Sequence, residues 1–179
     1  MEATFPALDA VLRDSGRVDA ATLDRLAIEH SPDTPLLLHL LRLAESEEPR
    51  TQIAATALLK RYRERSIIFE ERVVTRLLDL LSSPSHWEAT LHLLQMLAHL
   101  PIASGHTEAL CDLARDLLRH RNTFVRAWAY SALHHLAALY PEYRSDVSPL
   151  LDRAAQVEAA SVRARLRQLP PLDNIPSNA

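Results

Sequence analysis

A chain of 179 residues that is 47% hydrophobic and 24% charged has the composition of a folded globular protein, which excludes a wholly disordered chain. Its net charge of −3 argues against general affinity for nucleic acid, because nucleic-acid-binding domains are usually basic. The single cysteine, Cys111, excludes an intramolecular disulfide, and two glycines are too few for a glycine-rich phosphate loop.

Targeting signals are not evident in the sequence. The N-terminus lacks the basic start and apolar core of a signal peptide. The sequence contains no run of about 18 apolar residues, the length that is needed to cross a bilayer. We therefore expect a cytoplasmic protein without a membrane-spanning segment.

Helical spacing of apolar residues runs through the N-terminal part of the chain. Two short helical segments of undecided type come first, around residues 8–12 and 23–27. Thr34 followed by Pro35 predicts an N-cap and the first position of a strongly apolar helix. Pro49 opens the next predicted helix by the same logic.

The same spacing continues through the middle of the chain. A helix is predicted within residues 69–81, and Ser85 with Glu88 fits a capping box at the start of the following helix. Asn122 can cap a later helix, and Pro141 ends it. Two further helices follow.

The last helix is expected to stop at the two prolines that begin the segment 170–179, which we predict to be a flexible tail. No segment shows the sustained two-residue alternation of a β-strand. The sequence therefore predicts an all-α protein.

Parts of the sequence recur at a period in the high thirties. Residues 125–133 have a partner about 37 residues on, at 161–169, and both contain a Val-Arg pair. Residues 54–58 match residues 129–133. Residues 86–100 match the other copies only in the pattern of their apolar residues. Such a period with two helices per unit is typical of helical repeat arrays.

The pattern apolar-Arg-x-x-Ala-x-x-Ala-Leu at the start of a second helix resembles the HEAT-repeat family. The resemblance weakens in the order 122–139, 159–169, 50–64 and 85–100. It implies a short right-handed α-α superhelix, armadillo-like in type, with about four helix pairs after the N-terminal helices. We expect a single solenoid domain over residues 1–169.

Several roles follow from this resemblance. In HEAT repeats the second helices line the concave face, and the family arginine braces neighbouring repeats through an acidic residue. That structural role carries over to Arg126 and Arg163. Because the family most often binds proteins, we predict a non-catalytic interaction or scaffold module with an unidentified protein partner, no cofactor and no metal, although fold alone does not fix function.

Candidate partner-binding residues lie on two predicted second helices. Glu88, His92, Gln95 and His99 share one face of the first, because they are spaced at i, i+4, i+7 and i+11. His92 and His99 are two turns apart, about 10 Å, which is too far for one metal ion. The second helix adds Tyr130 and His134.

Other features have alternative interpretations. Tyr130 could equally pack on the next repeat. Trp87 and Trp128 stand where aromatic residues usually fill the space between helix pairs, with stacking on a base or sugar as the other interpretation. The basic stretch around Arg61 has acidic neighbours, which favours a salt-bridged surface over a phosphate site. Cys111 is expected to be an inert thiol.

The alternative function is a DNA-repair protein resembling the HEAT-like alkylpurine DNA glycosylases, which hold a basic concave face with an aspartate and tryptophans. This chain is acidic, and no carboxylate stands clearly among its tryptophans. A resemblance to the HEAT-like lyases that attach bilins ranks lower, because their shorter period is missing. No catalytic motif occurs, so a non-enzyme is favoured, and the sequence leaves the oligomeric state open.

Overall fold

The computed structural model describes residues 4–13, 18–83 and 86–174. All regular structure within these ranges is helical, with ten α-helices and three short 3₁₀ turns, so the prediction of an all-α chain is confirmed. None of the described helices is both long and apolar enough to span a membrane. The chain divides into two compact units, residues 1–99 and 100–179. The predicted single solenoid domain stays a prediction.

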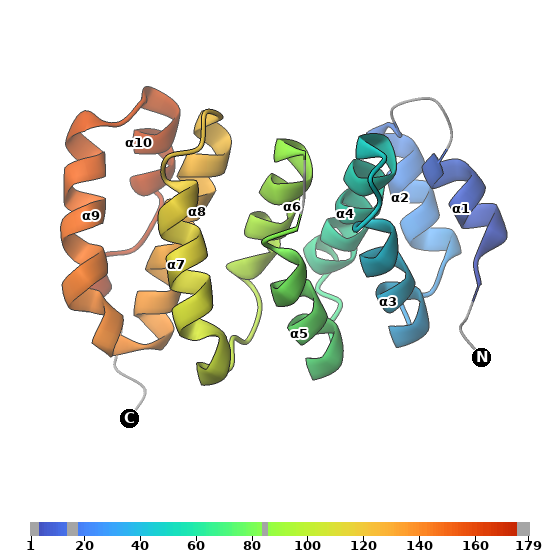
Figure 1. Ribbon diagram of the computed structural model, residues 1–179, viewed down its shortest axis with the longest axis horizontal. Helices are drawn as coiled ribbons and strands as arrows, with labels where there is room; N and C mark the ends of the chain where they lie inside the picture. The colour runs from blue at the N-terminus through green and yellow to red at the C-terminus, as the bar shows by residue number, and fades with distance from the viewer. Residues whose placement is uncertain (1–3, 14–17, 84–85, 175–179) are drawn as a thin grey trace. The chain divides into compact units, whose positions relative to one another are not determined.

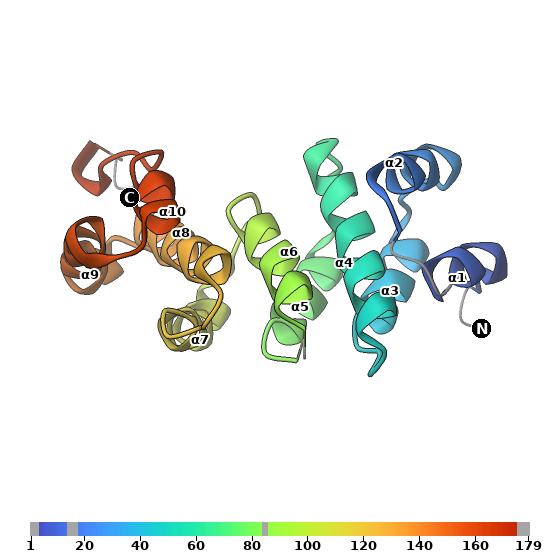
Figure 2. The ribbon, with the colours of Figure 1, turned by 90° about the horizontal axis from the view of Figure 1, so that it is seen from above.

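The first unit is built around one long helix. Its six helices are α1 (Pro6–Arg13), α2 (Ala20–Glu29), α3 (Thr34–Leu43), α4 (Pro49–Glu64), α5 (Glu71–Leu80) and α6 (Trp87–Leu97). Helix α4 packs against α2 and α6 as well as α1 and α3, and α3 packs against α5 (Figure 1 and Figure 2). Helix α4 is therefore central, and Leu58 and Leu59 on it are fully buried.

The starts of two helices show how far local chemistry sets this arrangement. Pro49 opens α4 as predicted, because proline lacks a donor that would have no partner in the first turn. Helix α3 is capped by Asp33 and not by Thr34, since the Asp33 carboxylate accepts a hydrogen bond from the N–H of Leu36 at 2.9 Å. The capping box predicted at Ser85 lies outside the described residues.

The second unit is built around α8. Its helices are α7 (Thr107–Leu117), α8 (Thr123–Leu139), α9 (Arg144–Val157) and α10 (Ala160–Leu166). Helix α8 packs against each of the other three (Figure 1). Asn122 caps it as predicted, with its Oδ1 accepting from the N–H of Phe124 at 2.9 Å. Tyr130, Ala154 and Val162 join α8, α9 and α10 in one apolar cluster.

Candidate functional site

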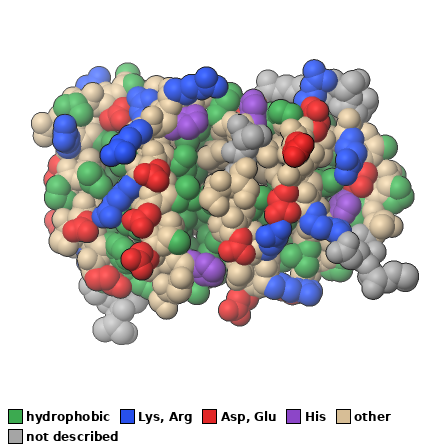
Figure 3. Space-filling model, in the orientation of Figure 1, with side chains coloured by type: hydrophobic (Ala, Val, Ile, Leu, Met, Phe, Trp, Pro, Cys, Tyr) green, Lys and Arg blue, Asp and Glu red, His purple; other side chains and the backbone are tan. Residues whose placement is uncertain are grey.

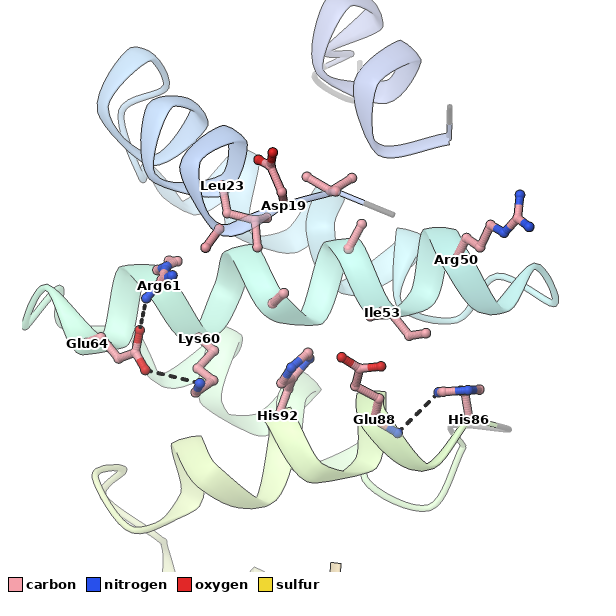
Figure 4. A pocket seen from close by; sticks show the side chains of 14 residues that line it. Asp19, Leu23, Arg50, Ile53, Lys60, Arg61, Glu64, His86, Glu88 and His92 are labelled. Atoms are coloured by element: carbon pink, nitrogen blue, oxygen red, sulfur yellow. Dashed lines mark hydrogen bonds and ion pairs between the residues drawn. The ribbon is translucent and has the colours of Figure 1, made fainter. Parts of the chain in front are cut away.

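A groove of about 790 Å³ lies along α4, between α2 and α6 (Figure 4). The stripe of α4 that lines it consists of Arg50, Ile53, Ala54, Ala57, Lys60, Arg61 and Glu64. These residues recur at spacings of three and four, so they share one face of the helix. A ligand-sized site typically has a volume of roughly 300–1,000 Å³, so the groove is large enough to bind part of a partner.

The floor of the groove is apolar and made of small side chains. Ala54 is buried on α4, while Ala57 and Ile53 are half-buried beside it. Leu23 from α2 adds a buried apolar side chain. The two alanines leave room above α4 because a methyl group is the smallest apolar side chain that a helix can present. The floor is therefore suited to receive an apolar side chain from outside.

Ion pairs close one end of the groove. Glu64 accepts from Lys60 at 3.1 Å and from Arg61 at 3.0 Å (Figure 4). Arg61 also pairs with Asp24 of α2 at 3.0 Å. These pairs confirm the salt-bridged surface predicted for this basic stretch. The cations at this end are already neutralised, which disfavours a role in holding phosphates.

Helix α6 forms the second wall, and polar bonds hold it against α4. The Oε1 atom of Gln52, a buried residue of α4, accepts from the N–H of His86 at 3.0 Å. The Thr56 hydroxyl lies 3.0 Å from Nδ1 of His92 and 2.9 Å from the carbonyl oxygen of Gln52. If the hydroxyl proton is donated to that carbonyl, the Nδ1–H of His92 donates to the hydroxyl oxygen. Glu88 and His92 both line the groove (Figure 4).

The other two predicted residues of α6 lie outside the groove. Gln95 is half-buried, and its Oε1 is buried without a hydrogen-bond partner among the described residues. His99 is exposed just beyond the end of α6, and its carbonyl oxygen accepts from Arg63 at 2.9 Å. The structure thus brings together two of the four residues in the predicted stripe.

Tyr130 and His134 belong to the second unit and have little exposed surface. Tyr130 is 8% exposed within the α8–α9–α10 cluster, and His134 is 6% exposed. Nε2 of His134 lies 2.7 Å from the carbonyl oxygen of Pro170, and burial lowers the pKa of His134. Leu172 is buried as well, so the described start of the expected tail, up to residue 174, lies against α8.

The two arginines expected to brace repeats have different surroundings. Arg126 at the start of α8 contacts the Glu158 carboxylate, which follows α9, through Nη2 at 3.0 Å and Nε at 3.2 Å. This pairing raises the pKa of Arg126 and lowers that of Glu158. Arg163 on α10 is exposed and makes no ion pair within the described part of the chain. The brace itself stays a prediction.

The described lining of the groove includes acid–base side chains such as Glu88 and His92 but lacks two common nucleophiles. None of its described lining residues carries a hydroxyl or a thiol. In the described residues, no three histidine, cysteine, aspartate or glutamate side chains are grouped to hold a metal ion. Cys111 is buried in the second unit, where burial raises the pKa of its thiol.

Sequence reasoning missed the α4 stripe that forms the floor of the groove. It treated residues 50–64 as a partial repeat and Lys60 and Arg61 as surface charge. The available signal was Ile53 and Ala57 at helical spacing between charged residues. Comparison with known proteins found no similarity: no family model and no curated protein matches the sequence, and no solved structure matches the fold.

Proposed function

We propose that this chain is a non-catalytic interaction module built of HEAT-like helix pairs, and that the α4 groove holds a short segment of a partner protein. The groove carries the proposal, because it combines an apolar floor with a polar rim on α4, the helix that contacts four others of its unit. An amphipathic helix laid in such a groove buries its apolar face and leaves its polar face in water.

Recurring side-chain bonds support the stacked-repeat part of the proposal. Thr56 bonds to His92, which is 36 residues further along, and Ser131 accepts from Arg165, which is 34 residues further along. His134 bonds to Pro170, again 36 residues away. Each bond joins the second helix of one proposed pair to the next pair. A separation near the proposed period in both units is what stacked helix pairs would produce.

Charge favours a protein partner over nucleic acid. The groove contains both acidic and basic residues, and its cations at Lys60 and Arg61 are paired. On the face shown in Figure 3, acidic and basic side chains are interspersed and do not form a field of one sign. A phosphate backbone requires unpaired cations, whereas a peptide helix accepts a mixed rim.

The test uses a displayed library of peptides of about 15 residues, long enough for four helical turns. Selected peptides are then measured against Ala57→Arg, which fills the groove, and against the control Ala10→Arg, which places the same side chain on the exposed side of α1. We expect Ala57→Arg to weaken binding at least about tenfold and the control to have no effect. Ile53→Gln repeats the test with a smaller change, and thermal melting checks each fold. Unchanged binding by both folded groove variants would contradict the proposal.

A further inference from the structure

Arg165 of α10 is held rigidly against α8 by neutral groups. Its guanidinium lies 3.8 Å from the centre of the Trp128 ring, a close cation–π contact. Its Nε donates to the Ser131 hydroxyl at 2.9 Å, and its Nη1 donates to Oε1 of Gln168 at 3.1 Å. Stacking and two hydrogen bonds fix both the plane and the direction of the guanidinium.

This half-buried cation has no acidic partner among the described residues. No described carboxylate forms an ion pair with it, and burial, with no opposing acidic group, lowers the pKa of Arg165. Arg126 on α8 differs, because Glu158 neutralises it and raises its pKa. A half-buried charge normally requires a partner of opposite sign. Arg126 thus has a carboxylate partner, whereas Arg165 has none among the described residues.

The donors that remain define what could bind. An arginine carries five N–H groups, and the hydrogen bonds of Arg165 to described residues use the one on Nε and one of the two on Nη1. One N–H on Nη1 and two on Nη2 remain. Gln168, which bonds to Nη1, is exposed, and Nη2 is not among the described buried atoms that lack a partner, so this end of the guanidinium is open to solvent. Adjacent N–H groups on Nη1 and Nη2 match the two oxygens of a carboxylate.

We propose that Arg165, stacked on Trp128, is a recognition site for a single carboxylate, supplied by a glutamate or aspartate side chain of a protein partner. One cation matches one singly charged, planar ligand, whereas a phosphate dianion would require more positive charge. This site lies in the second unit and does not depend on the α4 groove, so either proposal can fail without the other.

The test follows the indole N–H signals of the full chain by two-dimensional NMR. The chain has two tryptophans, so the signal of Trp87, in the first unit, serves as an internal control for the signal of Trp128. The probes are the capped tripeptide acetyl-Ala-Glu-Ala-amide, its glutamine counterpart and inorganic phosphate, each titrated at constant ionic strength. We expect the glutamate peptide alone to move the Trp128 signal saturably, with a dissociation constant on the order of millimolar.

Matched variants separate this role from general attraction. Arg165→Gln should abolish the Trp128 shift, while Arg163→Gln removes an exposed arginine from the same helix and should leave the shift intact. Arg165→Lys keeps the charge and the fold but loses the planar fork, so it should weaken the shift severalfold. An equal shift with the glutamine peptide, an equal loss in Arg163→Gln, or saturation by phosphate at lower concentration would each overturn the proposal.

Discussion

The contact between α4 and α6 and the contact between α8 and α10 use a buried hydroxyl in the same way. Thr56 and Ser131 lie close to the carbonyl four residues earlier, at 2.9 and 3.2 Å. Each hydroxyl also bonds to a side chain of the neighbouring helix, which is His92 of α6 in the first unit and Arg165 of α10 in the second. The equivalent hydroxyl thus bonds to a histidine ring in one unit and to an arginine cation in the other.

This difference shows how similar contacts between two helices can present different chemistry. In the first unit the small residue Ala57 leaves a groove above α4, and the nearby cations are paired. In the second unit the polar residues Tyr130 and His134 are buried, and Arg165 is a half-buried cation without an ion pair among the described residues. We therefore expect the first unit to bind by shape and the second by charge.

The largest effect should come from Arg126, which anchors α8 to the segment after α9. The side chains of Arg126 and Glu158 are only 19% and 15% exposed, so Arg126→Met leaves a poorly solvated carboxylate. We expect a loss of about 2 kcal/mol in the free energy of unfolding. Urea unfolding measures it. The control Arg163→Met should change stability by less than about 0.5 kcal/mol, and an equal loss there would show that the ion pair adds nothing.

Double-mutant cycles compare the two hydroxyl contacts directly. One cycle combines Ser131→Ala with Arg165→Ala, and the other combines Thr56→Val with His92→Ala. We expect a coupling energy of about 1 kcal/mol for Ser131–Arg165 and about 0.5 kcal/mol for Thr56–His92, because bonds to charged groups are stronger. Chemical denaturation of each variant measures these energies. The reverse order would mean that charge does not distinguish the two contacts.

His134 should make the second unit sensitive to acid. Burial holds the pKa of His134 below the ordinary value. At pH values between the two, the unfolded chain therefore binds more protons than the folded chain. The contribution of His134 to stability is complete above about pH 6.5 and is lost as the pH falls below that value. His134→Gln keeps an N–H donor for Pro170 and should reduce the loss of stability between neutral and mildly acidic pH. The other eight histidines are present in both proteins, so the difference isolates His134.

The sequence predicted the type of structure better than the surfaces. Helical periodicity located the helices, and Pro49 and Asn122 mark their starts because caps depend on neighbours in the chain. The predicted cap of α3 is wrong because Asp33 and Thr34 are both good caps. Only the backbone conformation, which is extended at Asp33, decides between them. The arrangement of the helices as about four HEAT-like pairs in a superhelix stays a prediction.

The candidate site was only partly predictable, because burial depends on residues distant in the sequence. Spacing placed Glu88 and His92 on one face, and the structure places both at the groove. The same reasoning made Tyr130 and His134 candidate partner-binding residues, but α9, α10 and the segment around Pro170 cover them. Periodicity defines the faces of one helix and contains no information on which neighbour packs there.

The smallest expected effect concerns how α4 ends, which differs from the end of α8. Ser66 follows α4 with a φ of +62°, and the N–H of Ile67 bonds to the carbonyl of Tyr62 at 3.1 Å, as in a Schellman motif. Tyr140 ends α8 in an extended conformation. Glycine relieves the strain of a left-handed serine but increases the entropy of the unfolded chain, so Ser66→Gly should stabilise the protein by about 0.5 kcal/mol. The control Ser31→Gly, which replaces an exposed serine without a positive φ, should not stabilise it, and a gain in thermal melting temperature for both variants would refute the strain argument.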